Sequence, residues 1–231
     1  MLSQAVEDYL KTIYKLEEKS SATTNEIARA MSVAAASVTN MLKRLAELKL
    51  VEYTSHKGVT LTEPGRKAAL EIIRHHRLIE MYLHEALGYS WDKVHEEAEH
   101  LEHHISEEFE DKIAEFLGHP THDPHGDPIP TKDGKLPETK HDSLFKTEAG
   151  ETVIVQRVPD SDSELLRYLA DIGLKPKAKV EILLKAPFNG PITLKVNDKE
   201  IIIGKEVAEK VFVAPFKNEG IAKLKKQKNK K

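Results

Sequence analysis

The sequence contains no cysteine, and its apolar runs are short. Its 231 residues include twelve histidines but not one thiol. The absence of cysteine excludes a disulfide framework, a thiolate nucleophile, an iron–sulfur cluster and a cysteine-ligated zinc site. Apolar runs such as 201–203 are far too short to cross a bilayer. Because residues 1–20 alternate charge with apolar side chains, they also lack the pattern of a signal or transit peptide. We therefore expect a cytoplasmic protein with no membrane partner.

Charge and histidine are distributed unevenly. Residues 1–70 carry ten Lys and Arg against eight Asp and Glu, whereas residues 71–117 carry four against thirteen, a net charge of −9. Residues 217–231 form a basic tail of seven Lys against one Glu, which is typical of a solvated chain end. Ten of the twelve histidines lie between His75 and His125. The acidic middle of the chain therefore also holds most of the imidazole.

The N-terminal segment has the pattern of a winged helix-turn-helix. Three helices are expected over 4–18, 23–31 and 34–48. A β-hairpin with strands at 50–54 and 59–62 is expected to follow them. The second helix begins with the capping-box spacing of Thr23 and Glu26. The third helix buries an apolar stripe that includes Val38, Leu42 and Leu45.

The opposite face of the third helix has the chemistry of a DNA-reading surface. A recognition helix needs small donors and acceptors for base edges and cations for phosphates. The candidate DNA-contacting residues of the helix and of the hairpin tip are Ser37, Thr39, Asn40, Lys43, Arg44, His56 and Lys57. The alternative is an ordinary three-helix module with a solvated face, since helix-turn-helix folds also mediate protein contacts.

The rest of the chain divides into a helical part and a β part. Helices are expected over 64–87, 91–104 and 106–117. Residues 118–141 hold five of the eleven prolines and no helical period, which indicates a linker or irregular loop. Short strands are expected after this loop, over 151–158, 179–184, 192–196, 200–203 and 211–214. One helix is expected among them, over 163–172. This spacing indicates a small barrel-like β domain.

One stretch of the helical part has the spacing of a metal site. His95, Glu99, Glu102 and His103 stand at i, i+4, i+7 and i+8, so a continuous helix would place all four on one face. The preceding helix repeats the i, i+4 pairing with His76 and Glu80. Carboxylates and imidazoles on facing helices can converge on a divalent cation, although each residue alone could be a solvated surface side chain. The spacing from His95 to His100 does not match the zincin motif.

Four stretches together resemble the diphtheria toxin repressor family of metal-dependent transcriptional regulators. They are EDYLKTIY at 7–14, HHRLIE at 75–80, VHEEAEHLEH at 94–103 and HPTHDPHGDPIP at 119–130. The resemblance implies an α+β multidomain protein with an N-terminal winged helix, a central all-α dimerisation domain and a C-terminal SH3-like β-barrel. The corresponding boundaries are 1–63, 64–140 with the Pro-rich loop, 148–216, and the basic tail 217–231.

The resemblance also implies two metal sites per subunit. The first would use Asp8, Glu99, Glu102 and His103. The second would use Glu80, His125 and Asp160, with His76 and His95 nearby and with help from Asp123, for which His122 is a rival.

The first of these sites differs from the corresponding site of the iron-type relatives. Iron-type members have a methionine and a cysteine where this chain has Asp8 and Glu99, so the resemblance favours the manganese-responsive branch. Oxygen and imidazole ligands suit Mn²⁺ better than sulfur does, although Fe²⁺, Co²⁺ or Zn²⁺ could also bind. Lys11 stands where short manganese regulators have a glutamate, which argues against their closely spaced binuclear site.

The implied function is a homodimeric repressor that binds double-stranded operator DNA when metal is bound and controls metal-uptake genes. Such a protein is not an enzyme and has no small organic substrate. The alternatives are an iron-responsive repressor of the same family, a metal-dependent hydrolase and a metal buffer that does not bind DNA.

Overall fold

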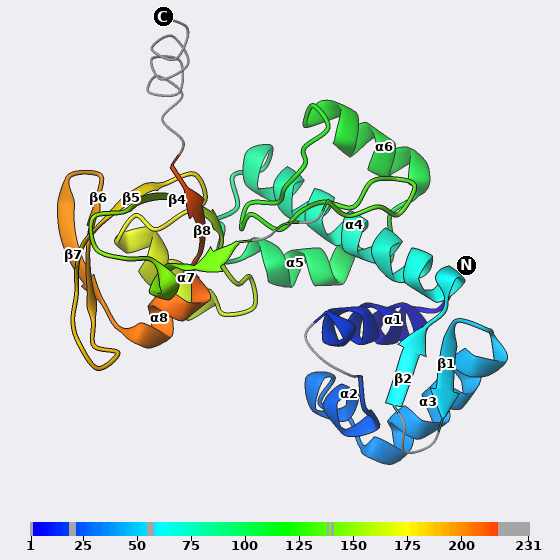
Figure 1. The fold of residues 1–231 in the computed structure, drawn as a ribbon. Coiled ribbons are helices and arrows are strands. Elements are labelled where there is room, and N and C mark those ends of the chain that lie inside the picture. The colour runs from blue at the N-terminus through cyan, green and yellow to red at the C-terminus, as the bar shows by residue number, and fades with distance from the viewer. Residues whose placement is uncertain (1, 19–21, 55–57, 138, 140, 217–231) are drawn as a thin grey trace, which may run out of the picture. The chain divides into compact units, whose positions relative to one another are not determined.

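The chain forms two compact units in the computed structural model, which describes residues 2–18, 22–54, 58–137, 139 and 141–216 (Figure 1). Unit 1 takes residues 1–90, 94–123 and 128–137, and unit 2 takes 91–93, 124–127 and 138–231. Each unit has a hydrophobic core of its own. The winged-helix segment and the helical segment thus belong to one compact unit, and the domain boundaries expected above stay predictions.

The first part of unit 1 is a winged helix-turn-helix, as the sequence predicts. Its elements are α1 (Gln4–Glu17), α2 (Thr24–Ala30), α3 (Ala35–Glu47), β1 (Val51–Thr54) and β2 (Gly58–Leu61). Thr23 and Glu26 form the expected capping box at the start of α2. Helix α3 buries Val38, Leu42 and Leu45 completely, in a core that α1 and the antiparallel hairpin share.

Three further helices complete unit 1: α4 (Glu63–Glu85), α5 (Val94–Leu101) and α6 (Glu107–Phe116). Helix α4 follows the hairpin directly, and Pro64 is its second residue rather than its first. Its first turn lies against the backbone just before β1, since a Cβ atom on Gly65 would meet the carbonyl oxygen of Leu50 at 1.9 Å. Only glycine permits this close approach, which fixes α4 to the winged helix.

The helix expected over 91–104 is wrong at both ends. Trp91 belongs to the core of unit 2, and α5 begins only at Val94. At the other end Glu102 and His103 lie in a turn, because the chain must reverse before Ser106, whose hydroxyl caps α6. The four predicted metal ligands therefore do not share one helical face.

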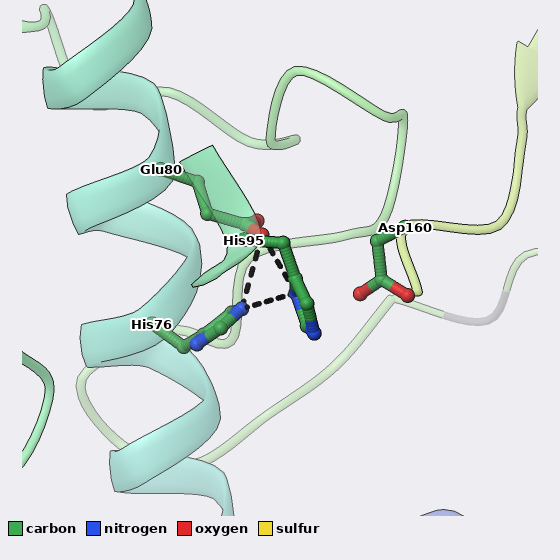
Figure 2. A group of neighbouring side chains, drawn as sticks. All are labelled: His76, Glu80, His95 and Asp160. Carbon is green, nitrogen blue, oxygen red and sulfur yellow. Dashed lines mark hydrogen bonds and ion pairs between the residues drawn. The ribbon is translucent and has the colours of Figure 1, made fainter. Parts of the chain in front are cut away.

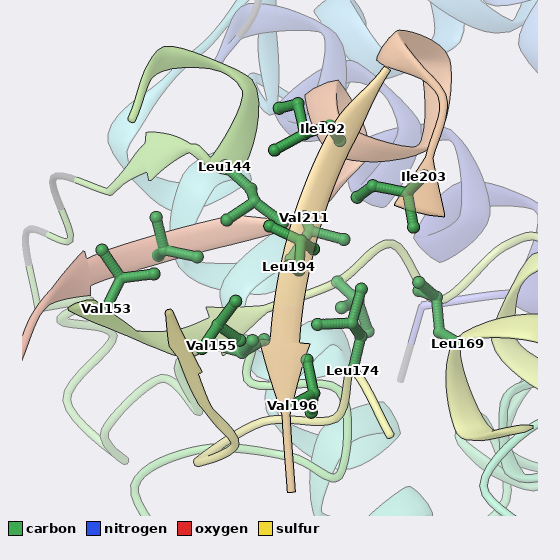
Figure 3. Close-up of a cluster of buried hydrophobic side chains, with 14 of the residues drawn as sticks. Leu144, Val153, Val155, Leu169, Leu174, Ile192, Leu194, Val196, Ile203 and Val211 are labelled. Atoms are coloured by element: carbon green, nitrogen blue, oxygen red, sulfur yellow. The ribbon is translucent and has the colours of Figure 1, made fainter. Parts of the chain in front are cut away.

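Unit 2 contains one six-stranded antiparallel sheet of order β3-β8-β4-β5-β6-β7. Its strands are β3 (Asp142–Ser143), β4 (Thr152–Arg157), β5 (Lys179–Lys185), β6 (Ile192–Val196), β7 (Lys199–Ile203) and β8 (Phe212–Pro215). Register shifts in the β4–β8 and β5–β6 pairs are the irregularities that bend a sheet around its core. Figure 3 shows that core, in which Val155, Leu169 and Leu194 are fully buried.

Unit 2 contains more helical structure than the single helix expected from the sequence. Helix α7 (Ser163–Asp171) is the predicted one, and a second helix, α8 (Lys205–Lys210), and a 3-10 turn, η1 (Leu144–Lys146), accompany it. The short α8 has only one fully buried residue, Ala208, and so gives a weak hydrophobic period. Among the helices of the described residues, none is both long and apolar enough to span a membrane.

Candidate metal centre

A carboxylate–imidazole cluster lies in unit 1 where α1 approaches the turn after α5. Ligand atoms of Asp8, Glu102 and His103 all lie within 4.8 Å of one another. His103 Nε2 is 2.9 Å from Asp8 Oδ1 and 3.3 Å from Glu102 Oε1. This nitrogen is buried and makes no hydrogen bond of acceptable geometry to any described residue. Carboxylate oxygens and an imidazole nitrogen that converge in this way form an arrangement that a cation would complete.

Glu7 orients the imidazole of this cluster. Its Oε2 lies 2.7 Å from His103 Nδ1, on the side of the ring away from Asp8. Since a carboxylate can only accept, Nδ1 carries the proton, and the Nε2 lone pair points toward the cluster. A carboxylate behind a ligating imidazole is the usual second partner of a metal-bound histidine. The sequence analysis missed Glu7, and its only signal was its position next to Asp8.

Lys11 occupies the other side of Glu102. Its Nζ lies 2.6 Å from Glu99 Oε1 and 2.8 Å from both carboxylate oxygens of Glu102. Glu99 is therefore bound to Lys11, and its ligand atom lies within 4.8 Å of those of His76 and Glu102. Its part in the first site, which the resemblance implies, stays a prediction. Burial acts to lower the pKa of the Lys11 ammonium, but Glu102 and Glu99 raise it on balance. Burial and the charge of Glu102 raise the pKa of Asp8.

A second cluster joins α4 to α5. His76 Nε2 lies 3.0 Å from Glu80 Oε1 and 3.0 Å from His95 Nδ1, which is itself 3.1 Å from Glu80 Oε1. Figure 2 shows these three side chains pointing toward one another. The other nitrogen of His76 lies 2.5 Å from Glu102 Oε2, so this imidazole connects the two clusters. Burial acts to lower the pKa of His76, but Glu80 and Glu102 raise it on balance.

The remaining predicted ligands lie in several places. Asp123 is buried in unit 1, with its Oδ2 3.6 Å from Arg77 Nε. His125 and Asp160 belong to unit 2, so their part in the second site stays a prediction. Within unit 2, His125 is fully buried, its ring stacks on that of Trp91, and its Nε2 lies 2.7 Å from the Trp91 carbonyl oxygen. The rival ligand His122 is exposed in the loop before it.

The predicted DNA-reading residues of α3 form one exposed face. Ser37, Asn40, Lys43 and Arg44 are exposed, opposite the buried stripe of the helix. Thr39 is half-buried, and its hydroxyl donates to the Ala35 carbonyl at 3.0 Å. His56 and Lys57 lie outside the described residues.

A buried ion-pair network supports the turn that carries Glu102, and sequence reasoning did not find it. His75 Nε2 lies 3.1 Å from Glu110 Oε2, and its Nδ1 lies 3.3 Å from the backbone carbonyl of Glu102. Arg74 donates to the other oxygen of Glu110. The network ties α4 and α6 to the turn. The i, i+4 spacing of His76 and Glu80 indicated a role for His76 only, and no local spacing links its neighbour His75 to Glu110.

The donor set fits a hard or borderline divalent cation. The two clusters offer carboxylate oxygens and imidazole nitrogens, and the chain has no thiolate to offer. Such ligands suit Mn²⁺, Fe²⁺, Co²⁺ and Zn²⁺. A winged helix in one compact unit with two such clusters defines a metal-binding DNA-binding regulator as the class of protein.

The comparisons with known proteins identify the family. Residues 1–59 match the model of the iron dependent repressor N-terminal DNA binding domain, and residues 62–131 match that of the iron dependent repressor metal binding and dimerisation domain. Residues 143–215 match the FeoA domain. The chain belongs to the iron-dependent repressor family, which includes the diphtheria toxin repressor, and the resemblance and the fold class predicted from the sequence are confirmed.

Individual relatives respond to different metals according to their names. The iron-dependent repressor IdeR of Mycobacterium tuberculosis (strain ATCC 25618 / H37Rv) is 32% identical over 194 residues, which cover 78% of this chain and 84% of that protein. The regulator MntR of Geobacillus kaustophilus is 35% identical over 118 residues, covering 51% and 83%. A solved manganese-dependent transcriptional repressor in complex with manganese is 37% identical, covers 91% of this chain and 100% of its own, and has a TM-score of 0.83. Family members are transcriptional repressors and not enzymes, which excludes the hydrolase alternative.

Glu110→Gln is expected to destabilise the protein at neutral pH and to lose this effect in acid. Burial acts to raise the pKa of Glu110, but hydrogen bonds from His75 and Arg74 outweigh it and lower the pKa from 4.5 to about 2. Because the pKa is lower in the folded state, the ionised carboxylate stabilises the fold above about pH 4.5, and this contribution disappears as the pH falls toward 2. The free energy of unfolding should fall by about 1–3 kcal/mol at neutral pH.

Thermal or denaturant unfolding at neutral pH and near pH 3 measures this difference. Glu108→Gln, which alters an exposed carboxylate of the same helix, should change stability at neither pH. An equal loss for Glu110→Gln at both pH values would contradict the ion-pair account.

Proposed function

We propose that this chain is a homodimeric, manganese-responsive repressor that binds double-stranded operator DNA and controls genes of metal uptake in the cytoplasm. The observation that carries the proposal is the division of the first cluster between two parts of unit 1. Asp8 lies on α1, which shares a core with α2 and α3, whereas Glu102 and His103 lie in the turn after α5. The domains expected at 1–63, 64–140 and 148–216 correspond in this proposal to the DNA-binding, dimerisation and SH3-like parts.

Asp8, Glu102 and His103 would hold the first metal ion. When bound, the ion supplies the positive charge that lets the two carboxylates lie close together beside the imidazole. Glu7 keeps the His103 lone pair directed inward, and His75 holds the backbone at Glu102. The residues thereby fix the turn after α5 to α1.

A second site would form around Glu80 and His95 on α4 and α5. His76 stands between the two sites and contacts Glu102. We propose that Asp123, His125 and Asp160 complete this second site. Asp123 is a candidate because its carboxylate is buried in unit 1, beside the guanidinium of Arg77.

The donor chemistry supports Mn²⁺ over Fe²⁺ as the physiological ion. Asp8 supplies oxygen where a sulfur ligand would favour a softer ion, and hard oxygen ligands suit Mn²⁺. Zn²⁺ would bind more tightly in a test tube by the Irving–Williams order, so selection in the cell depends on geometry and availability. An iron-responsive repressor is the second candidate, and the identity to IdeR supports it.

The exposed face of α3 would read the operator. In a dimer, two recognition helices must match successive major grooves, about 34–36 Å apart. Fixing α1 to the turn after α5 selects one orientation of the winged helix within each subunit. Such a selection couples metal and DNA binding, typically by about 1–3 kcal/mol.

An aromatic face on α4 and α6 is suited to join two subunits. Phe109 is 47% exposed and Phe116 is 69% exposed. Both pack edge-to-face against Tyr82, at ring-centroid distances of 6.5 and 6.0 Å. Exposed aromatic clusters of this kind mark interaction surfaces, and the residues lie in the segment that matches the dimerisation domain model.

Asp8→Ala is expected to abolish metal-stimulated operator binding and to leave the dimer folded. The substitution removes the only described ligand of the first cluster that lies on α1. Asp111→Ala, which removes an exposed carboxylate of α6, should behave as the unaltered protein. Gel shifts with DNA from upstream of its own gene, titrated with Mn²⁺, measure the effect. Full metal stimulation of Asp8→Ala would disprove the role of Asp8.

Lys43→Ala should weaken DNA binding for all sequences and lower the slope of log affinity against log salt by about 1, as expected for a lost phosphate contact. Asn40→Ala should instead cost about 1–3 kcal/mol and relax sequence preference, as expected for a base contact. Lys146→Ala, in unit 2, serves as the control for a lost exposed lysine. Fluorescence anisotropy at several salt concentrations separates the two effects, and identical behaviour of the two lysine variants would contradict the assignment of α3.

The double variant Phe109→Glu/Phe116→Glu is expected to be monomeric, because dimerisation through this face would bury two unpaired carboxylates from each subunit. Phe188→Glu, which alters a fully solvated aromatic residue of unit 2 with 99% exposure, should leave the dimer intact. Sedimentation velocity reads out the mass of each species. A dimeric double variant would show that another surface joins the subunits.

A further inference from the structure

We propose that Lys11 is an internal competitor of the metal ion. Its ammonium neutralises Glu99 and Glu102 when no ion is bound, and it lowers the affinity of the Asp8–Glu102–His103 cluster for divalent cations. This inference rests on the metal-binding function proposed above. Lys11 would thereby set the metal concentration at which the repressor responds.

The contacts of Lys11 are those of a bound cation. The residue is only 5% exposed, and a lysine is almost never buried to this extent unless it is paired. Its Nζ lies 2.6 Å from Glu99, 2.8 Å from both oxygens of Glu102 and 3.4 Å from His76 Nδ1. An ammonium has three protons to donate, and the two carboxylates can accept all of them.

Glu102 is the residue that both cations would use. Its Oε1 lies 2.8 Å from Lys11 Nζ and 3.3 Å from His103 Nε2. The side chain of Glu102 is fully buried, so salt and water screen its surroundings only weakly. A divalent ion held by Asp8, Glu102 and His103 would therefore experience the repulsion of a neighbouring ammonium through a shared carboxylate.

Solvent reaches the carboxylates of Asp8 and Glu99 from one side. Asp8, Lys11 and Glu99 line a surface cleft of about 420 Å³, together with Lys15. An ion can thus approach without unfolding of the unit. Lys11 also follows Asp8 by about one helical turn on α1, so the helix that would supply a ligand also supplies the competing charge.

Replacement of Lys11 by methionine distinguishes two roles of Lys11: competition with the metal ion, and holding Glu102 in position for it. Methionine keeps an unbranched apolar stem but carries no charge. If Lys11 competes, its loss leaves Glu99 and Glu102 uncompensated, which destabilises the metal-free protein and strengthens metal binding. If Lys11 instead only holds Glu102 in place, its loss weakens metal binding. The two roles predict opposite signs.

Isothermal titration of the metal-free full chain with Mn²⁺ measures the Mn²⁺ affinity of the unaltered protein, of Lys11→Met and of Lys15→Met. Lys15→Met is the matched control, because Lys15 lies in the same cleft one turn further along α1 and, within the described part of the chain, forms no ion pair with Glu102. We expect Lys11→Met to bind Mn²⁺ about tenfold more tightly, equivalent to about 1.4 kcal/mol, and Lys15→Met to change by less than about threefold. The melting temperature of metal-free Lys11→Met should fall, and Mn²⁺ should raise it by more than it raises that of the unaltered protein.

Equal or weaker Mn²⁺ binding by Lys11→Met would overturn the competition. If Lys11→Met is too unstable to purify without metal, Lys11→Gln, whose amide can still donate to Glu102, is expected to show the same sign. An absence of Mn²⁺ binding by the unaltered protein would refute the proposed function itself. That outcome is distinct from normal binding by the unaltered protein with no gain in either Lys11 variant, which refutes only the inference.

Discussion

The burial of one carboxylate, that of Glu102, organises unit 1. Its side chain has no exposed surface, and a buried carboxylate is stable only with positive charge or hydrogen bonds around it. Lys11 approaches it from α1, His76 from α4 and His103 from its own turn. The contacts that satisfy Glu102 therefore join the winged helix to the helical part of the unit. Both metal clusters lie along this chain of contacts, because the same groups that neutralise Glu102 are the groups that can ligate a cation.

The uneven charge of the sequence has a structural explanation in these contacts. The acidic segment 71–117 has a net charge of −9, yet three of its carboxylates, Glu80, Glu102 and Glu110, are almost fully buried. Glu110 is neutralised from within the segment by Arg74 and His75, whereas Glu102 depends on Lys11 from the first helix. The acidic segment is thus incomplete without α1, and divalent cations would offset more of its charge. Both the packing of α1, which brings Lys11, and the binding of a cation supply positive charge to the carboxylates of this segment.

Much of the fold could be predicted from sequence periodicity and capping, and the site only in part. Thr23 and Glu26 marked the start of α2, and the stripe of Val38, Leu42 and Leu45 oriented α3. The same periodicity failed for α5, because the chain turns after Leu101 and breaks the spacing that seemed to align Glu102 with His95. The ion pairs of Lys11 with Glu99 and Glu102 span 88 and 91 positions, so no local pattern could reveal them. Resemblance to a family supplied the candidate ligands, and the packing of α1 on the turn shows which of these side chains lie close together.

The central claim is that metal and operator DNA select the same arrangement of α1 and the turn after α5. Its most direct test is the Mn²⁺ affinity of the full chain, measured by isothermal titration with and without operator DNA. Because linkage is reciprocal, DNA should tighten Mn²⁺ binding by the same factor by which Mn²⁺ tightens DNA binding, within a range of about 5–150-fold. The same Mn²⁺ affinity in the presence and absence of saturating DNA would contradict the account.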